Sequence, residues 1–167
     1  RTMEIVLASG SPRRRELMAR ITPEYRVAPG TLDESRITAP TPQALVAALA
    51  AAKCAEAAAR FPAAAVVGAD TVVDCGGEVF GKPRDAADAA RMLRRLSGNV
   101  HEVHTGVCIQ APAGRQAFVA TSRVRFFPIP EAELEAYLAT EEPYDKAGAY
   151  AIQGRAALWL DAIEGDY

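Results

Sequence analysis

Basic side chains crowd the expected start of the first helix. Arg13, Arg14 and Arg15 follow a loop that contains Ser9 and Ser11. The N-terminus of a helix carries unsatisfied N–H groups and a partial positive charge, so it normally favours acidic side chains or a bound anion. Serine hydroxyls, backbone N–H groups and guanidinium groups together suit a phosphate. The segment therefore predicts a phosphate site or, with equal weight, a solvated basic face.

A carboxylate interrupts one of the most hydrophobic runs of the chain. Asp70 lies within residues 66–73, a run rich in valine that favours a buried strand. An ionised carboxylate in such a place needs a metal ion or a lysine beside it. The alternative places Asp70 at the end of the strand with its carboxylate in water. We favour the first interpretation, which makes Asp70 a functional residue.

Two lysines and a further carboxylate add to this chemistry. Lys53 shares a helical stripe with Leu45 and Leu49, so its stem should point toward the protein, although it could also extend to reach water. Lys82 follows a glycine and precedes a proline, and Glu34 lies in an irregular segment. Carboxylate oxygens are ligands for Mg²⁺, and lysines neutralise phosphates. The set therefore predicts binding of a divalent metal and a polyphosphate.

The composition limits the class of protein. The 167 residues suit one domain over residues 1–167, and half of them are hydrophobic. A net charge of −2 argues against a nucleic-acid binder. No apolar stretch is long enough to cross a membrane. The three cysteines, an odd number without a CxxC pair, favour a reducing cytoplasm over a disulfide framework. We expect a cytoplasmic protein with a small-molecule partner and neither a nucleic-acid nor a membrane partner.

Helices and strands alternate along the chain. Capping residues, glycines and hydrophobic periodicity predict helices from Pro12, over residues 42–60, after Asp85 to about Leu96, and over residues 131–139. The predicted strands cover residues 5–8, 66–73, 78–80, 103–110, 117–127 and 157–160. Interleaved helices and a central hairpin favour an α/β fold, with a mixed β-sheet flanked by helices.

The two histidines do not form a recognisable metal motif. His101 and His104 are three residues apart at the approach to a strand, so their rings should face opposite sides. The HExxH spacing of a helical zinc site is absent from the sequence. We expect both histidines to be structural or exposed.

Four separated motifs resemble the Maf family in order and spacing. They are Leu7-Ala8-Ser9-Gly10-Ser11-Pro12-Arg13-Arg14, Gly68-Ala69-Asp70-Thr71-Val72, Gly81-Lys82-Pro83 and Asp145-Lys146-Ala147-Gly148-Ala149-Tyr150. The likeness extends from Ile5 to Tyr167. It implies the architecture of the Maf and inosine-triphosphate pyrophosphatase proteins, also called HAM1-like or anticodon-binding-like, with a central cleft. It also implies a homodimer.

The resemblance implies a reaction and assigns roles. Maf proteins are pyrophosphatases that convert a nucleoside triphosphate to the monophosphate and pyrophosphate with a divalent cation, Mg²⁺, Mn²⁺ or Co²⁺. Asp70 would be the proton acceptor or a metal ligand, and Glu34 would share the metal. Lys53 and Lys82, together with Arg13, would neutralise the negative charge of the triphosphate. The implied substrate-binding residues are Ser9, Arg13, Arg14, Thr71 and Gln153.

Three positions distinguish branches of the family. They are Arg13, Thr71 and Gln153 in this sequence, a combination that resembles the dTTP/UTP-hydrolysing branch. The branch acting on 7-methyl-GTP typically has a tryptophan after the Ser-Pro pair and Ser-Asp-Gln around the aspartate. The amide of Gln153 can donate to and accept from a pyrimidine edge. Its alternative role is that of a polar loop residue.

Two other functions stay open. The family is also linked with inhibition of septum formation, so the protein could be a nucleotide-binding regulator that acts through a partner. An inosine- or xanthosine-triphosphate pyrophosphatase of similar architecture is the other alternative. The combined lysines and carboxylates favour an enzyme, and the motifs favour Maf. The chain stops at Tyr167, whereas family members usually continue with a Gly-Leu-Pro segment and a terminal helix, so we expect that helix to be missing.

Overall fold

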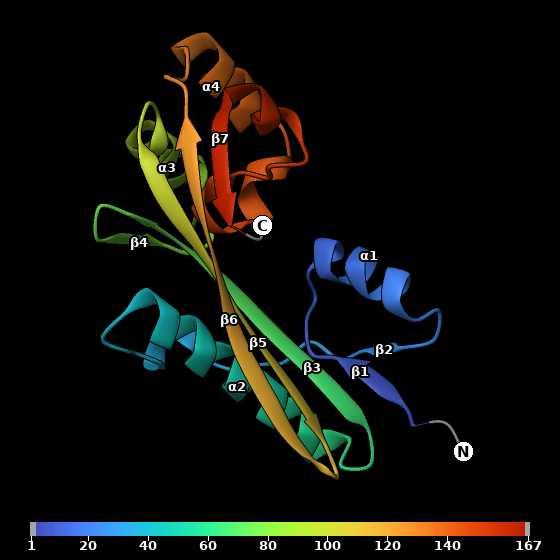
Figure 1. The fold of residues 1–167 in the computed structure, drawn as a ribbon. Coiled ribbons are helices and arrows are strands. Elements are labelled where there is room, and N and C mark those ends of the chain that lie inside the picture. The colour runs from blue at the N-terminus through green and yellow to red at the C-terminus, as the bar shows by residue number, and fades with distance from the viewer. Residues whose placement is uncertain (1–2, 166–167) are drawn as a thin grey trace. The chain divides into compact units, whose positions relative to one another are not determined.

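The computed structural model describes residues 3–165 as two compact units. Unit 1 comprises residues 3–70 and 105–119, and unit 2 comprises residues 71–104 and 120–165. Three long strands contribute to both units: β3 (Ala65–Cys75), β5 (Val100–Ala111) and β6 (Gly114–Phe126) (Figure 1). Within the described residues, seven strands form one sheet in the order β2-β1-β3-β5-β6-β7, with β4 beside β3.

Unit 1 combines parallel strands with two helices. Its further elements are β1 (Ile5–Leu7), α1 (Pro12–Ile21), β2 (Arg26–Val27), the short 3-10 helix η1 (Glu34–Arg36) and α2 (Pro42–Arg60). Strand β1 pairs in parallel with β2 and β3. Both α-helices begin with proline after a capping side chain: the Ser11 hydroxyl accepts from the Arg14 N–H, and the Thr41 hydroxyl accepts from the Ala44 N–H. Proline fits the first helical turn because the N–H that it lacks has no partner there.

Two glycines allow α2 to pack closely on the sheet of unit 1, and Figure 1 shows α2 alongside β3 and β5. A Cβ added to Gly68 would lie 2.7 Å from the Ala50 carbonyl oxygen, and one added to Gly106 would lie 2.3 Å from the Val46 carbonyl oxygen. No heavier residue fits at these positions unless the backbone moves. The glycines therefore set the depth at which α2 lies, and with it the position of Lys53.

Gly106→Ala is expected to lower the free energy of unfolding by about 2–3 kcal/mol, because overpacking against backbone atoms cannot be relieved by a side-chain rotation. Urea unfolding followed by circular dichroism measures this change. Gly81→Ala is the matched control, since a Cβ there meets no atom within 4 Å. Equal stability of the two variants would contradict the close packing of α2.

Unit 2 surrounds an aromatic core. Its further elements are β4 (Glu78–Phe80), α3 (Ala86–Leu96), α4 (Glu131–Leu138), η2 (Glu142–Asp145), η3 (Ala147–Ala149), η4 (Arg155–Trp159) and β7 (Leu160–Gly165). Strand β4 pairs antiparallel with β3, and β7 pairs antiparallel with β6. The buried His101 packs edge to face against Phe126 and Tyr150. Further edge-to-face pairs join Phe126 to Tyr150 and Trp159, and Trp159 to Tyr137. Such edge-to-face pairs add to the stabilisation that the burial of the rings provides.

The mixed sheet with flanking helices is confirmed, with two corrections. Strand β2 is a short addition that no hydrophobic pattern marked. The strand predicted over residues 157–160 was wrong, because Arg155–Trp159 form a 3-10 helix and the strand covers Leu160–Gly165. The tight helical turn buries Ala156 and Trp159 together in the core. The single domain and the cleft stay predictions. Residues 166 and 167 lie outside the described residues. Within residues 3–165, no helix is long and apolar enough to span a membrane.

His101 makes the stability of the protein dependent on pH. Burial lowers the pKa of His101 from 6.5 to about 4, and its Nε2 lies 2.6 Å from the Tyr150 hydroxyl. Between these two pKa values the unfolded chain takes up a proton that the folded protein does not. The free energy of unfolding is therefore expected to fall as the pH drops from 7 to 4, by about 3 kcal/mol at 1.36 kcal/mol per pKa unit.

Urea unfolding at pH 7 and pH 4.5 tests this expectation. His101→Gln removes the titrating group while an amide can still bond to the Tyr150 hydroxyl. The variant should show a smaller loss of stability on acidification than the wild type. An equal loss in both proteins would assign the acid sensitivity to other groups.

Candidate active site

Lys53 bridges two carboxylates in unit 1. Its Nζ lies 2.6 Å from Glu34 Oε1 and 3.2 Å from Asp70 Oδ1. The Lys53 and Asp70 side chains are 18% and 15% exposed, whereas that of Glu34 is 51% exposed. Close pairs that are withdrawn from water interact more strongly than surface pairs. The structure thus places a lysine, one of the two expected partners, beside the half-buried Asp70.

Three separate elements place these groups. Lys53 lies on α2, Asp70 lies on β3, and Glu34 is the first residue of η1. The carboxylate of Asp33 caps η1 by accepting a hydrogen bond from the Ser35 N–H at 3.2 Å, which fixes the backbone at Glu34. The close packing of α2 on Gly68 brings the stem of Lys53 down toward the strand. The contact therefore depends on packing between elements and not on local sequence.

Arg14 lies near the same carboxylates. Burial lowers the pKa of the Arg14 guanidinium below its ordinary value, and the charges of Asp70 and Glu34 oppose that shift. A positive group that is partly withdrawn from water next to two carboxylates is well suited to meet an entering polyanion. Its neighbour Arg13 instead forms an ion pair with Glu16 at 3.5 Å. Of the first two arginines, Arg14 is thus the one that the site carboxylates influence.

Two serine side chains hold the loop before α1 in place. The buried Ser9 hydroxyl accepts a hydrogen bond from the Ser11 N–H at 3.1 Å, and the Ser11 hydroxyl caps the helix. The first N–H groups of α1 are the ones that a phosphate would use. Arg15, by contrast, is exposed. A phosphate role for Ser9 stays a prediction.

The carboxylates of Glu34 and Asp70 are oxygen ligands of the kind that a hard divalent cation binds. Mg²⁺ and Mn²⁺ prefer oxygen ligands, and Mg²⁺ is commonly held by one or two carboxylates together with phosphates of the substrate and water. Glu34 and Asp70 supply two such carboxylates, and Lys53 and Arg14 lie beside them and offset their charge. The residues present therefore fit the metal dependence that a nucleotide pyrophosphatase family suggests.

Three further candidates belong to unit 2. Thr71 is half-buried on β3, Lys82 is exposed between β4 and α3, and Gln153 is exposed just before η4. The Gly148 N–H donates to the Gly81 carbonyl oxygen at 3.1 Å and so fixes the segment next to Lys82. Gly148 has φ 72°, and a Cβ there would lie 2.7 Å from Val73 Cγ2, so only glycine fits. The roles of Thr71, Lys82 and Gln153 stay predictions.

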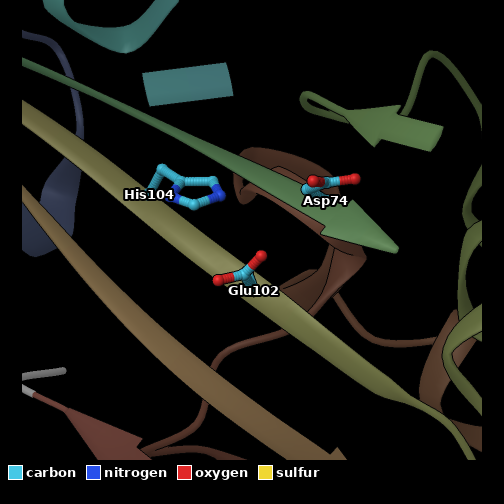
Figure 2. A group of neighbouring side chains, drawn as sticks. All are labelled: Asp74, Glu102 and His104. Carbon is cyan, nitrogen blue, oxygen red and sulfur yellow. The ribbon is translucent and has the colours of Figure 1, made fainter. Parts of the chain in front are cut away.

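Sequence reasoning missed a second cluster. Asp74, Glu102 and His104 bring one ligand atom each within 4.8 Å of the others in unit 2 (Figure 2). The alternative that His104 is exposed was wrong, since its side chain is fully buried, as is that of His101. Glu102 and His104 are two residues apart on β5 and therefore share a face. That spacing was the available signal, but Asp74 joins them only through the tertiary fold.

The fold is one that solved structures of other proteins share. The Ham1 protein of Staphylococcus aureus matches with a TM-score of 0.52 and 15% identity, covering 93% of this chain and 90% of that one. A HAM1 protein from Coxiella burnetii matches with a TM-score of 0.51 and 13% identity, covering 75% and 73%. At these identities the likeness establishes the mixed α/β architecture.

Sequence comparison gives the family. A family model described as Maf-like protein matches residues 4–167. The dTTP/UTP pyrophosphatase of Moorella thermoacetica is 51% identical over 166 residues, which cover 98% of this chain and 86% of that protein. The dTTP/UTP pyrophosphatase of Geobacillus sp. is 44% identical over 164 residues, covering 98% and 88%. The chain belongs to the Maf family, as its four motifs indicated.

Proposed function

We propose that this protein hydrolyses dTTP and UTP to the monophosphate and pyrophosphate. The observation that carries the proposal is the Lys53 bridge between Glu34 and Asp70, beside Arg14, in a member of the Maf family. A binding module has no need of a carboxylate held next to the cations that would receive phosphates. Two relatives that match nearly the whole chain and are named dTTP/UTP pyrophosphatase support the choice of substrate.

The reaction adds water across the bond between the α and β phosphates. Asp70 accepts a proton from the attacking water, and the oxygen of the water forms the new P–O bond. The bridging oxygen leaves with the electron pair of the bond that breaks. Lys53 holds the Asp70 carboxylate in place, and Arg14 faces the negative charge that develops on the phosphates. Ser9, Arg13 and Lys82 are proposed to bind the triphosphate chain.

Glu34 and Asp70 would hold the divalent cation, which we propose to be Mg²⁺, Mn²⁺ or Co²⁺. When bound, the cation lowers the cost of charge on the phosphate oxygens. Arg13, Thr71 and Gln153 are proposed to select the pyrimidine base, with Gln153 offering both a donor and an acceptor. We further propose a homodimer in the cytoplasm, and the free cysteines Cys54, Cys75 and Cys108 support a reducing compartment.

Pyrophosphate release from dTTP, UTP, CTP, ITP and 7-methyl-GTP, each with Mg²⁺ or Mn²⁺, tests the proposal. We expect dTTP and UTP to be hydrolysed with kcat/KM at least about tenfold above the others, which corresponds to 1.4 kcal/mol. Faster release from ITP would favour the inosine-triphosphate alternative. Tight nucleotide binding without turnover would favour the septum-formation regulator that acts through a partner.

A further inference from the structure

In unit 2 a histidine ring nitrogen and two carboxylates lie close together. Asp74 lies on β3, whereas Glu102 and His104 lie on β5, and their ligand atoms are within 4.8 Å of one another. Figure 2 shows the His104 ring with one nitrogen on the side of the two carboxyl groups. The carboxylates are half-buried and the histidine is fully buried. Such a mixed set of ligands is typical of a metal centre.

One ring nitrogen of the buried His104 has no hydrogen-bond partner. Its Nδ1 lies 2.8 Å from the Thr121 hydroxyl, and its Nε2 is buried without a hydrogen-bond partner. When Nδ1 donates its proton to Thr121, the lone pair of Nε2 is directed toward the carboxylates. Histidines that bind metals commonly use the second ring nitrogen in this way, which fixes both the tautomer and the ring orientation. The orphaned Nε2 is therefore an independent indication of a ligand at this place.

The charges of the cluster also lack compensation. Within residues 3–165, neither Asp74 nor Glu102 forms an ion pair with a lysine or arginine. Asp74 Oδ1 accepts a hydrogen bond from the Gly77 N–H at 2.9 Å, which orients the carboxylate. Two neighbouring carboxylates repel each other unless a cation lies between them. A divalent ion would neutralise the pair and supply the missing partner for Nε2.

We propose that Asp74, Glu102 and His104 bind a divalent transition metal, with Zn²⁺ and Cu²⁺ as the ions to test. An imidazole ligand favours such an ion over Mg²⁺ or Ca²⁺, which prefer oxygen alone. Ligands about 2.1 Å from a tetrahedral zinc are about 3.4 Å apart, so a small rotation of the carboxylates closes the site. The ion links β3 to β5 within unit 2. The proposal does not depend on the proposed pyrophosphatase activity, which uses Glu34 and Asp70.

Metal binding without nucleotide tests the site. Equilibrium titration with Zn²⁺ should show that Glu102→Gln and Asp74→Asn each weaken one site at least about tenfold, because even the loss of an outer partner costs 10- to 100-fold. Both substitutions keep the shape of the side chain, so the variants are expected to fold. Glu164→Gln, which removes an exposed carboxylate from β7 of the same unit, is the matched control and should bind as the wild type does.

A spectroscopic readout separates this site from the carboxylate pair of unit 1. Pulsed electron paramagnetic resonance of bound Cu²⁺ should show coupling to an imidazole ¹⁴N, which is absent in His104→Gln. Thermal unfolding should show a rise in Tm with Zn²⁺ in the wild type and in Glu164→Gln, and a smaller rise in Glu102→Gln. Unchanged Zn²⁺ affinity in both carboxylate variants, or bound Cu²⁺ without nitrogen coupling, would overturn the proposal.

Discussion

Asp70→Asn is expected to lower kcat for dTTP hydrolysis by about 10³-fold, within the range attributed to general acid–base catalysis. The amide keeps the shape of the side chain, but it cannot accept a proton from water and is a weaker ligand for a cation. Asp70 is 15% exposed and is held by Lys53 at 3.2 Å, so the substitution acts on a fixed position. Steady-state pyrophosphate release measures the effect.

The control for this substitution is Asp161→Asn, which changes an exposed aspartate on β7. It should retain the kcat of the wild type. Circular dichroism should show that Asp70→Asn is folded, because Lys53 keeps its contact with Glu34 at 2.6 Å. A kcat for Asp70→Asn within a few-fold of the wild type would remove Asp70 from the mechanism.

Lys53→Met is expected to reduce kcat/KM by about 10²-fold, as the loss of one donor to a developing charge does in other enzymes. Methionine has a similar length but no charge, so it fills the space above Asp70 without bridging it to Glu34. Two carboxylates would then face the entering triphosphate with less positive charge between them. Both a higher KM and a lower kcat should appear in the pyrophosphate assay.

Arg60→Met provides the matched control on the same helix. Arg60 is exposed at the last turn of α2, so its loss removes a positive charge away from the carboxylates. A similar loss of activity in both variants would indicate a general electrostatic effect. A loss confined to Lys53→Met would place the effect at the bridge.

The local patterns of the chain determined most of the elements. Thr41 with Pro42 and Asp85 marked the starts of helices, since a side-chain cap and a proline satisfy the first turn regardless of what packs on it. Asp70 and Lys53 stood out because each violates a hydrophobic period. Such violations are local and can therefore be read from one sequence.

The tertiary structure decided which of these residues meet. Lys53 and Asp70 are 17 residues apart, and their contact depends on how deeply α2 lies on Gly68 and Gly106. Nothing local specifies that depth, because it follows from the absence of two side chains on different strands. The 3-10 helix Arg155–Trp159 was missed for a related reason, since burial of Trp159 outweighs the local strand preference.

The sequence by itself thus determined the family, the main elements and the residues able to bind a cation and a triphosphate. The tertiary structure alone decided that Arg14, more than Arg13, lies under the influence of Asp70 and Glu34. It also brought Asp74 to Glu102 and His104. The physical reason is that a charge acts over a few ångströms of space, whereas sequence patterns record only neighbours along the chain.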